Sequence, residues 1–285
     1  MGSGKLGKIL GDCLLVALFI FFMFPIYWVA TMSFKSDQDI LSWPPKFVFS
    51  PTMSHYKAIL MNIVTKGTGL STTVDFPSYF KNSLVVCLLA VAISLVIGTP
   101  AAYAFARFKF KGSDSLAFNF LTFRFAPEML VIIPIYLFYT WSGLYNTYMG
   151  LVWVYQLITL PMVIWILRGY FEDVPVDLEQ AGRLDGYSRW SVALRITLPI
   201  VKPGLAATAL LTFIYAWNNF IFGMILGGVE VQPVTVAALQ FISAEKLRYG
   251  DMAAGSVLAA VPILILAVWA QKYLIRGLSL GAVKQ

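Results

Sequence analysis

Residues 174–203 read VPVDLEQAGRLDGYSRWSVALRITLPIVKP, and this charged stretch interrupts a chain that is otherwise strongly apolar. The loop that contains it, residues 169–203, holds five of the chain's 14 acidic residues. Of all 285 residues, 59% are hydrophobic and only 12% are charged. Such a composition lies outside the range of ordinary soluble domains, so the bilayer is the expected solvent. The stretch therefore marks a surface outside the membrane, between membrane-embedded segments.

Apolar runs on both sides of this stretch are long enough to cross a membrane. A helix of about 20 apolar residues spans a hydrocarbon core of roughly 30 Å. The runs are Ile9–Ser33, Phe80–Ala106, Leu116–Trp141, Met149–Leu167, Gly204–Leu226 and Met252–Leu274. Backbone groups in lipid must be satisfied internally, and the alternation typical of barrel strands is absent, so helices are predicted. The sequence predicts an all-α integral membrane protein with six transmembrane helices, the last five forming a core over residues 80–275.

Basic residues in the short loops predict the orientation of these helices, because such loops stay in the cytoplasm. One side receives Lys5, Lys8, Arg107, Lys109, Lys111, Arg168, Arg183, Arg189, Arg195, Lys202, Arg276 and Lys284. The tails 1–8 and 276–285 are therefore predicted to be cytoplasmic, and residues 34–79 external. The segment from Lys35 to Lys81 also contains five lysines, but no inverted topology keeps the other loops consistent. The net charge of +7 indicates topology and not a nucleic-acid surface, because no soluble basic face with interleaved aromatic residues exists.

Residues that support catalysis or metal binding are scarce. The single histidine, His55, has no cysteine or second histidine near it in the sequence and is interpreted as a surface residue. Cys13 and Cys87 lie in apolar runs, where a free cysteine acts as a small hydrophobic residue. Residues 2–8 match a phosphate-binding loop only in spacing, because Ile9 replaces the metal-binding Ser or Thr. No catalytic, metal or nucleotide site is predicted, so any energy source must belong to a partner.

A short amphipathic helix is predicted at the start of the charged stretch. Pro175 suits a first helical turn. The apolar positions that recur at helical spacing are Val174, Leu178, Ala181 and Leu184. Glu179 and Arg183 lie four residues apart in the favourable order for an ion pair on an exposed face. Asp185 and Gly186 then form a break, because glycine readily adopts a left-handed conformation.

A second helix is predicted to follow this break, capped by Ser188. Its apolar face comprises Trp190, Ala193, Leu194 and Thr197. Pro199 and Pro203 are expected to redirect the chain. By composition alone, the two helices are either a hairpin lying in the headgroups or a docking surface for a partner outside the membrane.

The detailed pattern of this stretch is more specific than its composition. The run LEQAGRLDG at 178–186 continues with Ser188, Arg189 and Trp190, and then with ITLP at 196–199. This pattern resembles the EAA loop of ABC importer permeases, and most closely that of their carbohydrate-uptake family. Alignment on the Asp-Gly pair places the family's Glu-Ala-Ala on Gln180, Ala181 and Gly182. The usual glutamate is therefore neutral here, and Glu179 supplies a carboxylate one residue earlier.

Other segments extend the resemblance from the second helix to the C-terminus. They include Arg124 and Pro127, Trp217 and Asn218, and the ending Gly281, Ala282, Val283 and Lys284. The resemblance implies a permease subunit that moves a sugar, oligosaccharide or related polyol across the cytoplasmic membrane of a bacterium or archaeon by alternating access. It assigns coupling to an ATPase to Glu179, Gln180, Ala181, Gly182, Arg183, Asp185 and Gly186.

The resemblance also implies a set of partners. Two cytoplasmic ABC ATPase subunits would hold ATP and Mg²⁺, and this chain would bind no cofactor itself. A second, homologous permease subunit would complete the membrane part. An external solute-binding protein would deliver the carbohydrate or polyol to an outer face formed by residues 35–79 and 227–249. Membrane lipid surrounds the assembly, and no nucleic acid is involved.

Polar groups inside the predicted spans are candidates for a substrate pathway or gate. Arg124 and Glu128 are four residues apart, hence on one helical face, and are expected to pair with each other or across the bundle. Asn218 and Asn219 are predicted mid-helix, where they either line the pathway or bond to a neighbouring helix. A purely structural pairing is almost as good an explanation in both cases.

Aromatic residues beside these polar groups are further candidates. Trp217 could stack against a sugar ring, and Tyr136 is a weaker candidate because aromatic residues in membrane helices more often pack or lie at the interface. The alternatives to an importer are an intramembrane enzyme and a secondary transporter. The first needs a convergent catalytic set and the second typically shows inverted repeats, and neither pattern is visible.

Overall fold

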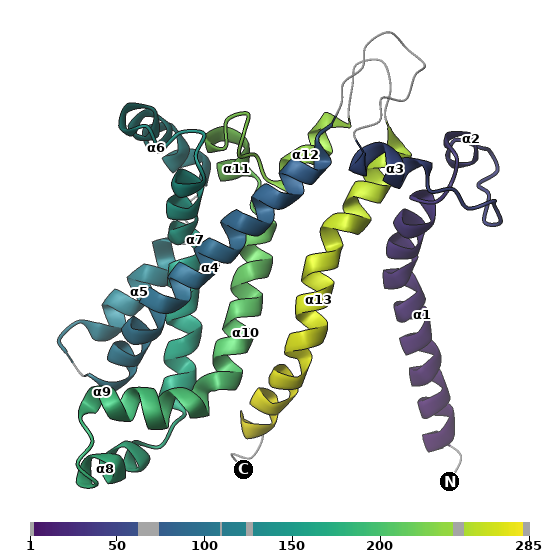
Figure 1. The fold of residues 1–285 in the computed structure, drawn as a ribbon. Coiled ribbons are helices and arrows are strands. Elements are labelled where there is room, and N and C mark those ends of the chain that lie inside the picture. The colour runs from purple at the N-terminus through teal and green to yellow at the C-terminus, as the bar shows by residue number, and fades with distance from the viewer. Residues whose placement is uncertain (1–2, 62–73, 109, 124–127, 242–247, 282–285) are drawn as a thin grey trace. The chain divides into compact units, whose positions relative to one another are not determined.

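The computed structural model describes residues 3–61, 74–108, 110–123, 128–241 and 248–281, and within these ranges it contains helices and no strands (Figure 1). Helices in these ranges that are long and apolar enough to cross a membrane are Gly7–Met32, Phe76–Arg107, Tyr148–Glu172, Arg189–Trp217 and Tyr249–Gln271. A shorter apolar helix covers Glu128–Ser142. The predicted all-α membrane fold is confirmed.

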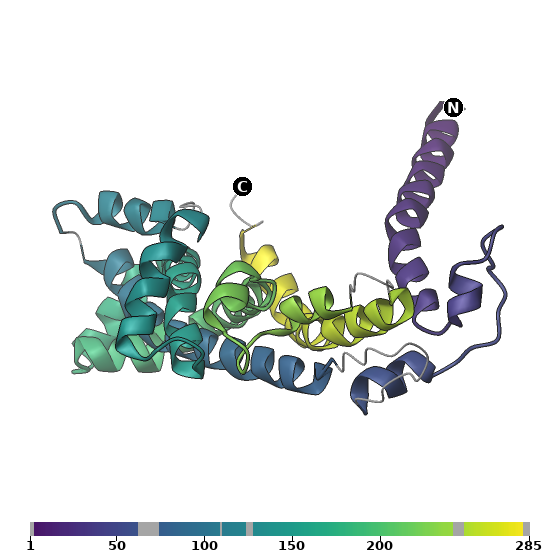
Figure 2. The ribbon, with the colours of Figure 1, turned by 90° about the horizontal axis from the view of Figure 1, so that it is seen from above.

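One compact unit comprises residues 1–77 and 237–261. It contains α1 (Ser3–Met32), α2 (Asp37–Ile40), α3 (Ser54–Leu60) and the first part of α13 (Tyr249–Gly281). After α1 the chain passes through α2 and a loop before it reaches α3 (Figures 1 and 2). The side chains from Ile9 to Tyr27 are exposed within this unit, as expected of an apolar helix whose surroundings are lipid.

The second compact unit comprises residues 78–236 and 262–285. Its helices are most of α4 (Phe76–Arg107), α5 (Ser113–Phe123), α6 (Glu128–Ser142), α7 (Tyr148–Glu172), α8 (Val176–Leu184), α9 (Arg189–Val192), a π-helical segment (Ala193–Thr197), α10 (Leu198–Trp217), α11 (Ile221–Leu226), part of α12 (Val234–Gln240) and the rest of α13. The long helix α7 packs against α5, α10 and α11. Within this unit α8 lies at one end, and α6 and α11 lie at the other (Figure 1).

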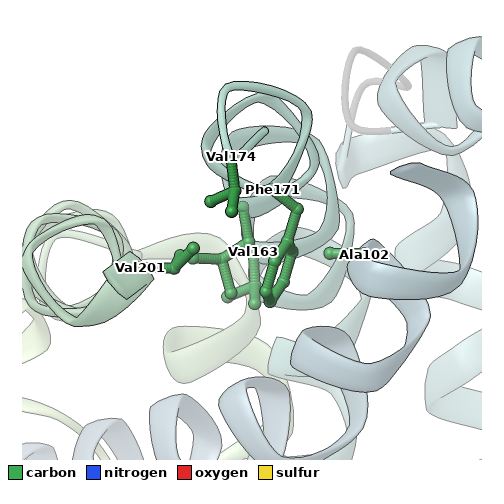
Figure 3. Close-up of a cluster of buried hydrophobic side chains, with 6 residues drawn as sticks. Ala102, Val163, Phe171, Val174 and Val201 are labelled. Atoms are coloured by element: carbon green, nitrogen blue, oxygen red, sulfur yellow. The ribbon is translucent and has the colours of Figure 1, made fainter. Parts of the chain in front are cut away.

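A hydrophobic cluster fixes the end of this unit that carries α8. Val163 and Phe171 of α7 lie beside Val201 of α10, with Ala102 of α4 facing Phe171 and Val174 next to them (Figure 3). Between membrane-spanning helices, contacts of this kind stabilise the fold through van der Waals packing, because lipid tails are as apolar as the side chains themselves. Because Val174 lies two residues before α8, the cluster fixes the point from which α8 projects.

Small residues allow the long helices of this unit to pack closely. A Cβ atom on Gly204 of α10 would lie 2.4 Å from the ring of Tyr170 on α7. A Cβ atom on Gly98 of α4 would lie 2.6 Å from Val163. Both glycines are therefore required by the distance between helices and not by a special backbone conformation.

The predicted third span, Leu116–Trp141, is helical wherever the structure describes it. Its residues belong to α5 and α6, and residues 124–127 between these helices fall outside the described ranges. The continuity of this span therefore stays a prediction.

The predicted fifth span, Gly204–Leu226, is wrong at both ends. Helical structure runs from Arg189 to Trp217 and includes both prolines, and the helix changes direction between α9 and α10, as predicted for this part of the chain (Figure 1). A π-helical turn just before Pro199 adapts the backbone, because the Leu198 N–H donates to the carbonyl of Ala193 five residues back. At the other end, α10 stops at Trp217, where the Asn218 side chain donates to the Ile214 carbonyl at 2.8 Å.

Candidate functional site

The two helices and the glycine turn predicted around Gly186 are present at the end of the second unit. Residues 176–197, which comprise α8, the turn, α9 and the π-helical segment, are called the projection. Helix α8 covers Val176–Leu184, and Gly186 has φ +89°, a left-handed conformation that favours glycine. The Tyr187 N–H donates to the Gly182 carbonyl at 3.1 Å and closes the turn. Ser188 caps the next helix, since its Oγ accepts from the Ser191 N–H at 3.2 Å. The predicted turn and cap are confirmed.

Gly182 allows the two helices of this projection to pack together. A Cβ atom at this position would lie 2.4 Å from Cδ1 of Ile196 and 3.3 Å from Cγ2 of Val192. The backbone of α8 therefore lies directly on the side chains of the helix that follows the turn. A larger residue at 182 must therefore displace the end of the Ile196 side chain.

Glu179 is turned inward, contrary to the expectation of an exposed carboxylate. Its Oε1 accepts hydrogen bonds from Arg107 Nε at 2.8 Å and from Thr197 Oγ1 at 2.9 Å. Its Oε2 accepts from Tyr103 Oη at 3.0 Å. The side chains of Glu179 and Arg107 are only 10% and 9% exposed, so their ion pair is largely shielded from water.

These four residues, the Glu179 cluster, join three parts of the unit. Tyr103 and Arg107 belong to α4, Glu179 to α8, and Thr197 to the helix after the turn. Arg107 Nη2 also donates to the Val174 carbonyl at 2.9 Å, next to the hydrophobic cluster. The predicted pair between Glu179 and Arg183 is therefore wrong, because the carboxylate points to Arg107 while Arg183 is exposed.

The outer face of α8 carries most of the remaining predicted coupling residues. Gln180, Ala181, Arg183, Asp185 and Gly186 are exposed. The apolar series at helical spacing also faces outward after its first member Val174, with Leu178 44% and Leu184 90% exposed. Beyond the turn, Trp190 is 60% exposed. The projection thus presents a mixed apolar and charged surface, the kind of patch that marks an interaction site.

The predicted pathway residues lie at the opposite end of the unit, where helices are interrupted. Asn219 follows the end of α10, is 8% exposed, and donates through Nδ2 to Glu128 Oε1 at 2.8 Å. Glu128 is the first residue of α6. Arg124 falls outside the described residues, so its predicted pairing with Glu128 stays a prediction. The two asparagines are not mid-helix as predicted, because α10 ends before them.

The aromatic candidates have mostly aromatic neighbours. Trp217 is only 2% exposed, and its ring stacks on Phe213 with centroids 5.4 Å apart and meets Phe80 edge-on at 5.8 Å. The expectation that this ring offers a face to a sugar is therefore not met in this conformation. Tyr136 is 37% exposed and packs edge-on against Tyr145 at 5.4 Å.

Arg107 and Tyr103 are parts of the site that no local sequence pattern indicates. In the sequence, Arg107 indicates only topology, and Tyr103 is one residue of an apolar span. The sequence feature that points to this ion pair is a basic residue at the end of a long apolar helix, together with an acidic residue in the amphipathic stretch. Sequence separation hides the pairing, because the two partners are 72 positions apart.

Long apolar helices of this kind define an integral membrane protein. The chain belongs to the family of binding-protein-dependent transport system inner membrane components, whose profile matches residues 94–280. It is thereby a permease subunit of an ABC importer, a component of a transporter.

Individual relatives and structures agree with this assignment. The trehalose/maltose transport system permease protein MalG of Thermococcus litoralis is 34% identical over 272 residues, which cover 94% of each chain. The diacetylchitobiose uptake system permease protein DasC of Streptomyces coelicolor is 34% identical over 287 residues, covering 100% of both.

Solved structures share the fold. A bacterial ABC transporter involved in the import of the acidic polysaccharide alginate contains a chain with TM-score 0.75 at 22% identity, covering 96% of this chain and 98% of that chain. A second structure, of a bacterial alginate ABC transporter in complex with an alginate pentasaccharide-bound periplasmic protein, gives TM-score 0.66 at 15% identity, covering 93% of each chain.

Proposed function

We propose that the importer served by this chain carries a carbohydrate or a related polyol. Support comes from the relatives described above, whose names specify trehalose, maltose and diacetylchitobiose and whose chains align over nearly their whole length. The proposal extends to the location: a multi-pass protein of the cytoplasmic membrane with both termini and α8 on the cytoplasmic side. Basic residues of the loops support this orientation.

The proposed mechanism is alternating access driven by partner subunits. Two ABC ATPase subunits bind ATP and Mg²⁺, and their closure moves α8 of this permease and its counterpart in a second permease. The observation that carries this proposal is the Glu179 cluster. It ties α8 to α4 through a shielded ion pair of 2.8 Å, so a displacement of α8 is transmitted to a membrane-spanning helix.

The exposed residues of α8 are proposed to contact the ATPase, with Glu179 as a positioning residue. Leu184 and Asp185 project at the tip, and Gln180 and Arg183 lie along the same outer surface. In this proposal the contact with the ATPase depends on the shape and the exposed apolar residues of α8, and not on a carboxylate at position 180.

The end of the unit that carries α6 and α11 is proposed to belong to the solute pathway or its gate. Glu128 and Asn219 meet where helices are interrupted, and interrupted helices inside a membrane protein are tolerated where they are buried in protein or line a cavity. An external solute-binding protein is proposed to deliver the solute to the outer side of the chain; residues 62–73 and 242–247 of the predicted outer face lie outside the described residues.

The test of this function is ATP-dependent uptake by the complete complex in proteoliposomes. The chain is co-expressed with its neighbouring genes, and co-purification of an ATPase and a second permease is expected. The variant Asp185→Ala with Gly186→Val alters the tip of the projection, and loss of solute-stimulated ATP hydrolysis is expected while membrane insertion persists. Lys202→Ala, which changes an exposed residue away from this tip, is the control. Full coupling in the tip variant would refute the assignment of α8.

A further inference from the structure

His55 lies in a buried polar cluster of the first unit, not on the surface as its sequence suggested. It belongs to α3 and is 7% exposed. Its ring Nδ1 lies 2.7 Å from Oδ1 of Asp251, in the first turn of α13. Its Nε2 lies 2.9 Å from the backbone carbonyl oxygen of Lys35, just after α1. One imidazole ring therefore connects three segments that are far apart in the sequence.

Both partners of the ring are hydrogen-bond acceptors. A backbone carbonyl has no proton to donate, so Nε2 must donate to Lys35. Asp251 Oδ2 already accepts from Arg248 Nε at 2.6 Å, which favours the ionised carboxylate. Nδ1 must then donate as well, and an imidazole that donates from both nitrogens is the imidazolium cation. If the proton sat on Asp251 instead, the pair would still hold the same number of protons.

The surroundings of the ring support a charged histidine. The hydrogen bond to Asp251 raises the pKa of His55 above its ordinary value, and burial opposes this shift without cancelling it. Asp37 Oδ1, 4.0 Å from Nε2, adds a second negative charge. The nearby Lys35 ammonium points elsewhere, over the ring of Trp28 with Nζ 4.0 Å from its centroid.

The backbone of α13 is shaped to receive this ring. A Cβ atom on Gly250 would lie 2.2 Å from Cε1 and Nε2 of His55. Glycine at 250 therefore lets the imidazole lie directly on the helix, in reach of Asp251. A second bond nearby, between Ser33 Oγ and Tyr56 Oη at 2.8 Å, also joins α3 to the segment after α1 but contains no group that titrates near neutral pH.

We propose that His55, Asp251 and the Lys35 carbonyl form a proton-dependent latch, which fastens α3 and the end of α1 to the first turn of α13. The latch holds while the ring carries both protons. Deprotonation leaves one ring nitrogen facing an oxygen acceptor with no hydrogen between them, so one of the two hydrogen bonds is lost and the lone pairs of that nitrogen and oxygen repel. The segment is then released.

The sign of the pH dependence follows from the raised pKa. Stability from the latch is fully present below the unfolded-state pKa of about 6.5 and is lost as the pH rises through the higher folded-state pKa. Alkaline conditions on this side of the membrane therefore loosen the first unit. In the orientation proposed above, that side is external, so external pH would tune the surface offered to a solute-binding protein.

The direct test uses the fact that the chain contains one histidine. Nitrogen-15-labelled histidine in the full-length chain, held in lipid nanodiscs, gives ring signals from His55 alone. Titration from about pH 5 to about pH 9 is expected to show both ring nitrogens protonated well above pH 6.5. Asp251→Asn is expected to lower the midpoint, because the hydrogen bond to Asp251 is the largest cause of the raised pKa of His55. A wild-type midpoint at or below 6.5, or a single protonated nitrogen at neutral pH, would overturn the latch.

Stability measurements separate the latch from a merely structural contact. The thermal midpoint is measured at acidic and at alkaline pH for the wild-type chain and for His55→Gln. The fall between the two pH values is expected to be larger in the wild-type chain by roughly 3 °C or more. Tyr56→Phe is the matched control, because it removes a non-titrating bond from the same helix and should lower the midpoint equally at all pH values. Parallel pH profiles for wild type and His55→Gln would refute the proposal. Neither the titration nor the thermal measurement requires transport, so the test of the latch is independent of the test of the proposed substrate.

Discussion

Removal of the Glu179 carboxylate is expected to destabilise the end of the second unit that carries α8. The variant Glu179→Ala deletes the acceptor of three side-chain hydrogen bonds, from Arg107, Thr197 and Tyr103. It leaves the Arg107 guanidinium, 9% exposed, with the Val174 carbonyl as its described partner. Leaving one member of a buried ion pair without its partner costs about 3–5 kcal/mol. A loss of this size lowers the thermal midpoint by on the order of 10 °C.

A double-mutant cycle tests whether this loss comes from the ion pair. Glu179→Leu, Arg107→Leu and the double variant are compared by thermal unfolding of the purified chain in one fixed detergent. The double variant is expected to lose less than the sum of the single variants, with a coupling energy of about 0.5–3 kcal/mol, because no charge is left buried alone. Gln180→Ala, a change of the exposed neighbouring residue, is the control and should stay within about 0.5 kcal/mol of wild type.

The same variants separate stability from coupling. In the assembled complex, Glu179→Ala is expected to uncouple ATP hydrolysis from uptake at temperatures where the complex remains intact, because α8 is no longer tied to α4. The reasoning would be refuted if Glu179→Ala unfolded at the same temperature as Gln180→Ala. Strict additivity of the two leucine substitutions would equally contradict the ion pair.

Two further predictions concern packing inside the second unit. Gly182→Val places side-chain atoms where Ile196 lies, 2.4 Å from the new Cβ, and should destabilise the chain by about 1–3 kcal/mol in thermal unfolding. Gly169→Ala is the control, because the space around its Cβ is open, and it should be neutral or slightly stabilising. Ser94→Ala removes a buried hydroxyl that lies 2.6 Å from Gln156 Oε1 and 2.7 Å from Thr159 Oγ1, so a loss of about 1–3 kcal/mol is expected, and an unchanged midpoint would show that the network contributes nothing.

Much of the candidate site was predictable because its rules are local. The turn at Gly186 follows from glycine's freedom at positive φ, and the Ser188 cap follows from the hydroxyl that accepts a backbone N–H. Both depend on neighbours within a few residues. Patterns of this kind survive in the folded chain because no distant contact competes with them.

The inward turn of Glu179 was not predictable in the same way. Helical spacing assigns it a position on α8 but cannot say which face of an amphipathic helix is buried when apolar and charged residues surround it. The apolar residues Leu178 and Leu184 suggest one buried face, yet they are exposed, and Glu179 with Gly182 are buried instead. The choice depends on Arg107 and Tyr103, which α4 brings to the same place. Likewise, the buried position of His55 depends on Asp251, 196 residues away.

The sequence by itself determined the solvent, the helical class and the position of the projection, because bilayer length, apolar composition and glycine geometry act within single segments. Only the tertiary structure decided which charges are buried together, where α10 ends and which face of α8 is open to a partner. These outcomes depend on the desolvation of groups brought together by packing, as in the shielded pair of Glu179 with Arg107.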